Sequence, residues 1–432
     1  MIIERKHYLK KIISKKENGL VKVITGIRRS GKSFLLFKLY HSYLNSIGIK
    51  DKYIIELELD NDINVKYRNP LELGAYIRSL LEEKDKMYYV FLDEIQAVEE
   101  IQNPYIENKK STVSFVDVLL GLMNIKNVDV YVTGSNSKML SSDIITEFRG
   151  RGDEIRVYPL SFKEFYDYYN GDKHDAWRQY YIYGGMPKVA LLDSHEEKST
   201  YLKDLFKKTY FTDIIEHNKI NNEDIIEDLL KIVASAIGSL TNPLNLSNTF
   251  KSVKKISISS TTISKYLDYF IDAFILTKIH RYDVKGKKYM DTPLKYYFTD
   301  IGLRNNLLGF RQKEANYIME NIICNELLLR GFDIDIGVVE YSHKNKEGKY
   351  IRSYLEIDFI ANKGSSRYYI QSALNVDSQE KRKQETESLS RINDSFKKIV
   401  IIKESIVPYH DEQGILYLGI QDFLLNKNSV DL

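Results

Sequence analysis

The chain has 432 residues, of which 43% are hydrophobic and 28% are charged, and this composition excludes a mostly disordered protein. The formal net charge of +3 is too small to indicate nucleic-acid binding by the whole surface, so such a site would have to be local. The single cysteine, Cys324, excludes a disulfide framework within the chain and favours a reducing, cytoplasmic compartment. No stretch reads as a signal-peptide core or a membrane span, and we expect no membrane partner.

The first motif is a glycine-bracketed turn between an apolar strand and a helix. Residues 26–33 fit the P-loop pattern G-x-x-x-x-G-K-[ST]. The two glycines permit a close backbone approach, so that loop N–H groups can hold a β-phosphate of ATP. Lys32 is expected to reach the β- and γ-phosphate oxygens, and the Ser33 hydroxyl to bind Mg²⁺. The expected ATP-binding residues here are Gly26, Ile27, Arg28, Arg29, Ser30, Gly31, Lys32, Ser33 and Phe34. The alternative is a turn that binds nothing.

The second motif is a pair of carboxylates after a second apolar strand. Residues 87–92 are apolar or aromatic and are followed by Asp93 and Glu94, as in a Walker B segment. Asp93 at the strand tip can hold Mg²⁺, and Glu94 can orient and polarise the attacking water as a catalytic residue. The alternative is an exposed acidic turn.

Polar residues later in this half complete the candidate catalytic set. A strand over 128–133 ends in a polar tip, where we expect Asn136, or Ser135 in its place, to contact the γ-phosphate and the water; the alternative is a helix N-cap. Arg149 and Arg151 precede a strand over 154–158. Either one is a candidate for an arginine that reaches a neighbouring subunit's γ-phosphate, which would imply a homo-oligomer; the alternative is an isolated surface arginine.

These motifs resemble those of a prokaryotic family of AAA-like ATPases with a C-terminal domain of unknown function. Pro-Leu-Ser-Phe-Lys-Glu-Phe at 159–165 and Gly-Gly-Met-Pro at 184–187 add to the resemblance, which covers essentially the whole chain. It implies a relation to STAND ATPases of the archaeal type, and a five-stranded parallel core with an additional strand between the two Walker strands. It also implies that Pro187 lies over the adenine. Without the resemblance, 184–187 would be only a turn between helices.

The expected fold is α/β and has four parts. They are a P-loop AAA-like core over 1–160, a helical lid over 161–220, a winged helix over 221–300 and a restriction-endonuclease-like domain over 301–432. In the winged helix, a short hydroxyl-rich helix over 260–272 and a lysine-tipped hairpin over 283–288 suit DNA. The alternative is that this module packs on the nucleotide site instead.

The last part follows the order of a PD-(D/E)-x-K nuclease core. A helix contains Glu320 and Glu326, a later strand contains Asp358, and the E-x-K position reads Gln371-Ser-Ala373. An amide and a methyl group therefore replace the second carboxylate and the lysine. We expect no nuclease activity, and a retained fold that binds an unidentified protein partner.

The sequence as a whole predicts a Mg²⁺-dependent, slow ATP hydrolase that acts as a nucleotide-driven conformational switch. Two alternatives stay open. One is a protein that binds ATP without turning it over, and the other is a DNA-bound regulator or defence component.

Overall fold

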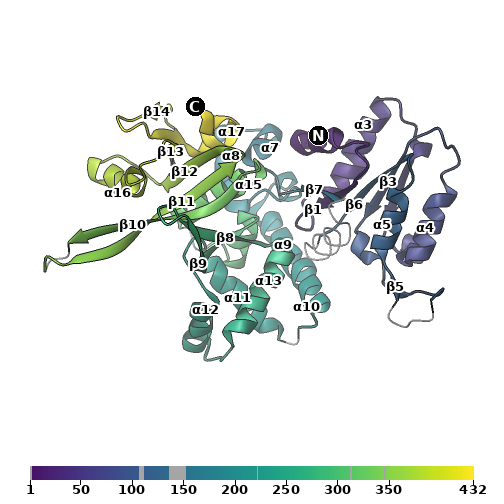
Figure 1. Ribbon diagram of the computed structural model, residues 1–432, viewed down its shortest axis with the longest axis horizontal. Coiled ribbons are helices and arrows are strands. Elements are labelled where there is room, and N and C mark those ends of the chain that lie inside the picture. The colour runs from purple at the N-terminus through teal and green to yellow at the C-terminus, as the bar shows by residue number, and fades with distance from the viewer. Residues whose placement is uncertain (1, 107–110, 136–151, 221, 312–313, 345–346) are drawn as a thin grey trace. The chain divides into compact units, whose positions relative to one another are not determined.

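The computed structural model describes residues 2–106, 111–135, 152–220, 222–311, 314–344 and 347–432 (Figure 1). The chain divides into two compact units. The first unit comprises Met1–Pro159 and Asp272–Phe274, and the second comprises Leu160–Ile271 and Ile275–Leu432. None of the described helices is long and apolar enough to cross a membrane.

The first unit is built on a parallel five-stranded sheet. Its strands lie in the order β2-β3-β6-β1-β7, and their bounds are β1 (Val21–Thr25), β2 (Ile54–Glu58), β3 (Tyr88–Asp93), β6 (Val128–Thr133) and β7 (Gly152–Arg156). Strand β6 lies between β1, which leads into the P-loop, and β3, which ends at Asp93. The structure thus confirms the parallel sheet of a P-loop core, with its additional strand between the two motif-bearing strands.

Two hydrophobic clusters cover the two faces of this sheet. One contains Leu73 of α4 (Pro70–Ser79) and Leu119 of α5 (Phe115–Met123), and the other contains Ile12 of α1 (Lys6–Ser14). Alternate residues of β3 enter different clusters, and for this reason the strand is apolar on both sides. The helix after the P-loop begins as α2 (Lys32–Phe34), continues through a π-helical stretch (Leu35–Tyr40) and ends as α3 (His41–Ser46). Two short strands, β4 (Ile101–Gln102) and β5 (Thr112–Val113), pair antiparallel.

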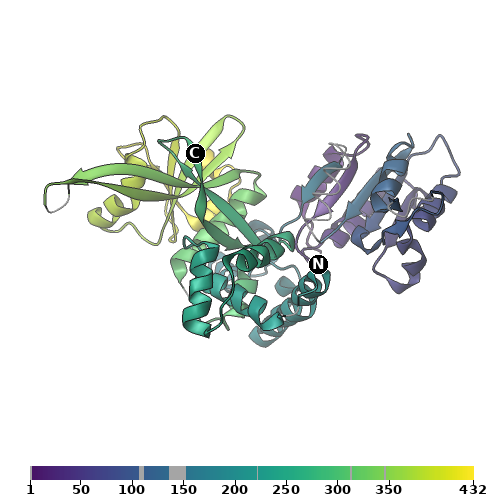
Figure 2. The ribbon, with the colours of Figure 1, turned by 60° about the horizontal axis from the view of Figure 1, so that its bottom comes forward.

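The second unit begins with helices and ends in a large mixed sheet (Figure 2). The helices before the sheet are α7 (Phe162–Tyr168), α8 (Lys173–Tyr183), α9 (His195–Leu205), α10 (Thr212–Asn218), α11 (Glu223–Ser235), α12 (Pro243–Thr249) and α13 (Ser260–Asp272). Further helices lie between or after the strands of the sheet in the sequence: α14 (Ile301–Leu307), α15 (Ala315–Leu329), α16 (Gln379–Ser390) and α17 (Ile420–Leu425).

The sheet of the second unit has eight strands in the order β14-β15-β13-β12-β11-β10-β8-β9. Their bounds are β8 (Leu276–Asp283), β9 (Lys288–Phe298), β10 (Asp333–Lys344), β11 (Tyr350–Lys363), β12 (Ser366–Ala373), β13 (Lys397–Ile402), β14 (Tyr409–His410) and β15 (Leu416–Gly419). The β8–β9 hairpin joins this sheet because β8 pairs with β10 in parallel. Leu389 of α16 packs with Val339 and Val400 on one face of the sheet.

Two stretches of this unit have the element order that the sequence analysis expected. Helices α11, α12 and α13 precede the β8–β9 hairpin, and an isolated bridge joins Thr241 to Leu294 in β9. The order α15-β10-β11-β12-α16-β13 is that of a nuclease-like core. The winged-helix and nuclease-like identities, and the boundaries between these parts, stay predictions.

Candidate functional site

The P-loop connects β1 to α2 through a strained turn. Gly26, Arg29 and Gly31 have φ angles of 136°, 65° and 95°. A Cβ atom on Gly26 would lie 2.1 Å from the carbonyl oxygen of Val157, so that any side chain there would collide with the backbone. Phe34, the last of the expected ATP-binding residues in this motif, ends α2 and is 40% exposed. The turn therefore requires glycine where the P-loop pattern has it.

Lys32 lies buried across this turn. Its Nζ donates to the carbonyl oxygens of Gly26, at 2.9 Å, and Ile27, at 3.2 Å. Burial lowers the pKa of Lys32, and the charges of Glu94 and Asp93 partly oppose that shift. Both direct partners are neutral, so that the ammonium group is able to stabilise an added polyanion such as a triphosphate.

Asp93 connects the P-loop to the tips of two other strands. Its Oδ1 accepts hydrogen bonds from Ser33 Oγ, at 2.9 Å, and from Thr133 Oγ1 at the end of β6. Burial raises the pKa of Asp93, while both hydroxyl donors lower it. A carboxylate and a serine hydroxyl in direct contact are oxygen donors of the kind that Mg²⁺ prefers, so these residues fit the metal expected from the sequence.

Glu94 follows in a left-handed conformation, with φ of 51°. Its backbone N–H donates to Thr133 Oγ1 at 3.0 Å, and its Oε2 accepts from Ser135 Oγ at 3.0 Å. Gln96 Nε2 also donates to this carboxylate oxygen. The structure thus brings Ser135, the expected substitute at the β6 tip, to the candidate catalytic carboxylate. Asn136, Arg149 and Arg151 lie outside the described residues.

Arg5 is part of this site and was not predicted from the sequence. It is 4% exposed and donates to the carbonyl oxygens of Ser30, at 2.9 Å, and Tyr158, at 2.7 Å. Its guanidinium lies 4.6 Å from the centroid of the Tyr8 ring. Arg5 therefore fixes one P-loop carbonyl against the end of the first unit. A lone arginine in a basic N-terminal stretch gave no sequence signal for this role.

The Gly-Gly-Met-Pro turn lies in the second unit and is held by a buried carboxylate. Asp300 Oδ2 accepts from the N–H of Gly185 at 2.7 Å, and its Oδ1 accepts from Leu303 N at 3.0 Å. Gly184 has φ of 74°, and a Cβ atom there would lie 2.3 Å from Asp300 Oδ1. Burial raises the pKa of Asp300 to about 6, although its backbone hydrogen bonds act to lower it. Pro187 follows this turn, and its contact with adenine stays a prediction.

A second group of charges, buried except for the part-exposed Glu356, lies where β9 and β11 meet α15. Lys295 Nζ contacts Glu320 Oε1 at 2.8 Å and Glu356 Oε1 at 2.6 Å. Asp358 Oδ2 accepts from Ser372 N at 2.8 Å, and Gln371 Oε1 lies 3.4 Å from Asp358 N. Within the described residues, no three His, Cys, Asp or Glu side chains are placed to hold a metal ion.

Lys295 supplies a cation that the sequence analysis did not find. Burial acts to lower the pKa of Lys295, but the charges of Glu320, Asp358 and Glu356 together raise it. The sequence analysis looked for a lysine at the position of Ala373 in β12, whereas this lysine comes from β9. Its only sequence signal is a charge within the otherwise apolar and aromatic run over 294–298.

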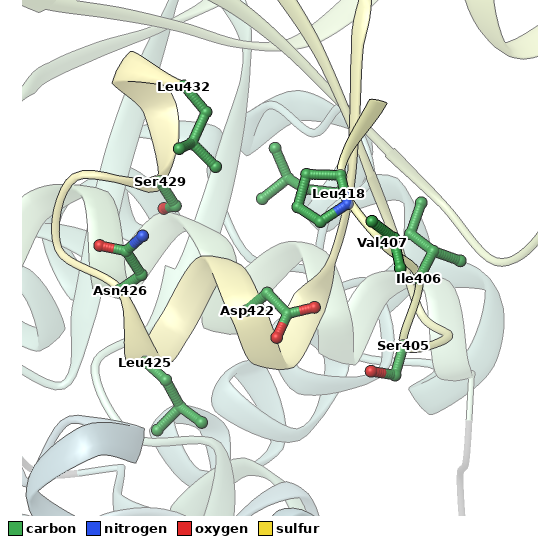
Figure 3. A pocket seen from close by; sticks show the side chains of 10 residues that line it. Ser405, Ile406, Val407, Leu418, Asp422, Leu425, Asn426, Ser429 and Leu432 are labelled. Carbon is green, nitrogen blue, oxygen red and sulfur yellow. The ribbon is translucent and has the colours of Figure 1, made fainter. Parts of the chain in front are cut away.

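A cavity of about 610 Å³ lies near the C-terminus, between the 405–408 segment and α17 (Figure 3). Figure 3 shows the apolar side chains of Leu418 and Leu425 at its wall together with Asp422 and Asn426. None of the residues expected from the sequence to bind nucleotide lines it.

The sequence matches two protein-family models and a full-length bacterial relative. Residues 18–166 match the family model described as AAA domain, and residues 174–314 match one described as Domain of unknown function (DUF8612). An uncharacterized protein of Haemophilus influenzae is 34% identical over 434 residues, which covers 98% of this chain and 99% of that protein. The chain belongs to the same family as this Haemophilus protein. The similarity to this relative thus extends over both units of the chain.

Other similarities are weaker. An uncharacterized protein of Methanocaldococcus jannaschii is 26% identical over 408 residues, covering 91% of this chain and 82% of that protein. Among solved structures, the ORC2 protein of Aeropyrum pernix is 13% identical, with a TM-score of 0.30. The match covers 71% of this chain and 92% of the ORC2 chain. This TM-score is too low to support an argument about function. The AAA-domain match and the parallel sheet together establish an AAA-like P-loop domain in the first unit.

Proposed function

We propose that the protein binds ATP with Mg²⁺ at the P-loop and hydrolyses it slowly. The observation that carries this proposal is the contact between Ser33 Oγ and Asp93 Oδ1 at 2.9 Å, because it joins the two motifs expected to share a metal ion. A buried hydroxyl supports it: Ser30 Oγ has no hydrogen-bond partner among the described atoms, which is consistent with a loop that completes its contacts with a ligand.

Each side chain of the site has a role in this proposal. The P-loop N–H groups and Lys32 bind the phosphates, and Lys32 must leave the Gly26 and Ile27 carbonyls to do so. Ser33 and Asp93 hold Mg²⁺, which when bound neutralises charge on the β- and γ-phosphate oxygens. Glu94 positions the attacking water and accepts its proton.

Ser135 and Gln96 regulate Glu94 in this scheme. Both donate to Glu94 Oε2, so that this oxygen is already engaged in hydrogen bonds. Binding of a γ-phosphate near the tip of β6 would draw Ser135 away and free the carboxylate for water. Through this coupling between the γ-phosphate and Glu94, a bound nucleotide would change the conformation of the protein, as a nucleotide-driven switch requires.

Phosphate release tests the proposal. The wild type should release phosphate from ATP only with Mg²⁺. Glu94→Gln should bind ATP as tightly as the wild type but release phosphate about 100-fold more slowly, since it keeps the shape and loses the base. Lys32→Ala should lose both binding and release. Equal and negligible release by all three proteins, with ATP binding intact in the wild type, would favour a protein that holds ATP without turnover.

Assembly is a further part of this proposal. An arginine that reaches a neighbouring subunit, whether Arg149 or Arg151, requires a homo-oligomer in the ATP-bound state. Light scattering with and without a slowly hydrolysed ATP analogue should show an increase in mass with the analogue. If the mass does not change and Arg149→Ala and Arg151→Ala both release phosphate at the wild-type rate, the arginine hypothesis is wrong.

We propose that the nuclease-like region binds a partner and does not cut nucleic acid. Its buried lysine contacts Glu320 and Glu356 directly, so two of the carboxylates already have a cation. Incubation of the purified protein with DNA and RNA in Mg²⁺ or Mn²⁺ should leave both intact. Cleavage that Asp358→Ala abolishes would show that this region is a nuclease.

A further inference from the structure

A two-stranded ribbon projects from the large sheet of the second unit (Figures 1 and 2). Strand β8 pairs with β10 only as far as Val338, and β12 pairs with β11 only from Phe359 onward. Beyond these points, the described residues 339–344 and 350–356 pair only with each other. A two-stranded ribbon without covering strands is only marginally stable in water, so that its length calls for a functional explanation.

One face of the ribbon carries aromatic and basic side chains, together with Glu340, whose Oε1 lies 3.4 Å from Arg352 Nε. In the antiparallel register, Glu340 pairs with Tyr354, Ser342 with Arg352 and Lys344 with Tyr350. Directly opposed residues of the two strands lie on the same face of the ribbon. Within each strand, every second residue lies on that face. Tyr350 is 74% exposed, Tyr354 is 59% exposed and the Arg352 side chain is 75% exposed. We call this face, defined by Lys344, Tyr350, Arg352 and Tyr354, the tyrosine–arginine face.

The opposite face of the ribbon is covered around Tyr341. Arg391, just after α16, lies 4.2 Å from the centroid of the Tyr341 ring, and Tyr341 stacks on His343 with ring centroids 5.3 Å apart. The tyrosine–arginine face is thus the more exposed side of the ribbon, and it is the side that we expect a partner to contact.

The tip of the β8–β9 hairpin extends this surface with more positive charge. Lys285, Lys287 and Lys288 are exposed, and Lys285 Nζ donates to the carbonyl oxygen of Glu340 at 2.8 Å. Asp283 Oδ1 accepts from the N–H groups of Lys285 and Gly286, so the tip is held in one conformation. Together, the described residues of 283–289 and 340–354 contain six lysine or arginine residues and three acidic ones.

The charge and the residue types indicate the class of partner. Lysine is depleted at protein–protein interfaces, whereas the tyrosine–arginine face and the β8–β9 tip contain four described lysines. Lysine and arginine beside exposed aromatic rings are the combination that binds nucleic acid, with the cations on phosphates and the rings on bases. Ring faces can stack only on bases that are not already stacked in a duplex. Tyr350 and Tyr354, about 13 Å apart along one strand, provide two such platforms with Arg352 between them.

We propose that the tyrosine–arginine face and the lysines of the β8–β9 tip form a binding site for single-stranded nucleic acid. This surface lies outside the P-loop and does not include α13. It shares the lysine-tipped hairpin over 283–288 with the expected winged-helix contact, but its tyrosine–arginine face and its single-stranded ligand go beyond that contact. Glu356 pairs with Val338, which places it on the same face of the sheet as Glu340. A bound strand would therefore run toward the buried group of Lys295 and its carboxylates.

Fluorescence anisotropy of the full chain tests this proposal, with a labelled oligothymidine of about 20 nucleotides and a duplex of the same length as probes. The wild type should bind the strand more tightly than the duplex at about 50 mM salt, and affinity should fall steeply as salt rises. Tyr350→Ala/Tyr354→Ala should weaken strand binding at least about tenfold and leave the salt dependence unchanged. Lys285→Glu/Lys287→Glu should weaken binding. It should also reduce the slope of the logarithm of the binding constant against the logarithm of the salt concentration by at least about one unit.

Matched controls lie in the first unit. Tyr105→Ala removes a tyrosine that is 85% exposed, and Lys50→Glu/Lys84→Glu reverses two exposed lysines. Both should bind the strand like the wild type. Unchanged thermal melting and ATP binding would show that the ribbon variants are folded, and the lysine variants test the site separately if the tyrosine variant does not fold. The proposal is wrong if the wild type binds no strand, prefers the duplex, or is affected equally by ribbon and control substitutions.

Discussion

Each unit of the molecule buries a lysine near carboxylates, and the two lysines differ in what contacts them directly. Lys32 in the P-loop donates to two neutral carbonyl oxygens and makes no ion pair with any residue that the structure describes. Lys295 in β9 contacts two carboxylates, from Glu320 and Glu356, at 2.8 and 2.6 Å. The first lysine is held by the backbone, and the second is held by opposite charge.

The pKa values of the two lysines shift in opposite directions for this reason. Burial lowers the pKa of Lys32 despite Glu94 and Asp93, whereas the carboxylates around Lys295 outweigh burial and raise its pKa. A buried ammonium group with neutral partners gains stability from an added anion, but one between two carboxylates has little to gain. The P-loop lysine is thus suited to binding, and the sheet lysine to holding the fold together.

The same substitution at both positions should separate these roles, with the largest effect at Lys295. Lys295→Met leaves the buried Glu320 and the part-exposed Glu356 without their cation, and we expect a loss of about 3–5 kcal/mol in the free energy of unfolding. Urea denaturation at neutral pH measures this loss. Adding Glu320→Gln and Glu356→Gln removes the uncompensated charges and should restore much of the stability. If Lys295→Met alone is as stable as the wild type, the ion pairs do not hold the fold.

Lys32→Met should affect binding and not folding. We expect ATP affinity to fall about 100-fold or more, because the positive charge that would contact the phosphates is lost. The free energy of unfolding should stay the same or rise, since a buried charge with only neutral direct partners is replaced by an apolar chain. Calorimetric titration with Mg²⁺–ATP and urea denaturation measure the two quantities, with Lys50→Met as an exposed control. A large loss in the free energy of unfolding would show that Lys32, like Lys295, stabilises the fold.

Asp300 tests a buried carboxylate that has backbone partners and no cationic partner in the part of the chain that the structure describes. Its pKa is raised from 3.8 to about 6, so the folded protein binds its proton more tightly than the unfolded chain does. Its contribution to stability should therefore be greatest below about pH 4 and should fall as the pH rises to 6, by on the order of 3 kcal/mol. The stability difference between the wild type and Asp300→Asn should change in this window. A difference that does not vary with pH would show that the pKa of Asp300 is not raised.

The comparison also shows what the sequence could predict. Local patterns specified the P-loop, the Asp93–Glu94 pair and all five strands of the first sheet, because each pattern needs only neighbouring residues. Lys295 and Arg5 were missed because their partners are distant in sequence: Lys295 meets Glu320 across 25 residues, and Arg5 meets Tyr158 across 153. Asp358 was identified from its place in a motif, but the cation beside it came from a strand outside that motif.

Arg5 should have the smallest effect of these residues, and it tests whether the backbone geometry of the P-loop matters for binding. Arg5→Lys keeps the charge but cannot reach both Ser30 and Tyr158 with a planar fork, so we expect a loss of about 1–3 kcal/mol in stability. ATP affinity should fall as well, because the Ser30 carbonyl loses the donor that fixes the loop around Lys32. Lys11→Arg, a substitution in α1, is the control and should change neither quantity. If Arg5→Lys lowers stability and leaves ATP affinity unchanged, Arg5 supports the unit without positioning the loop.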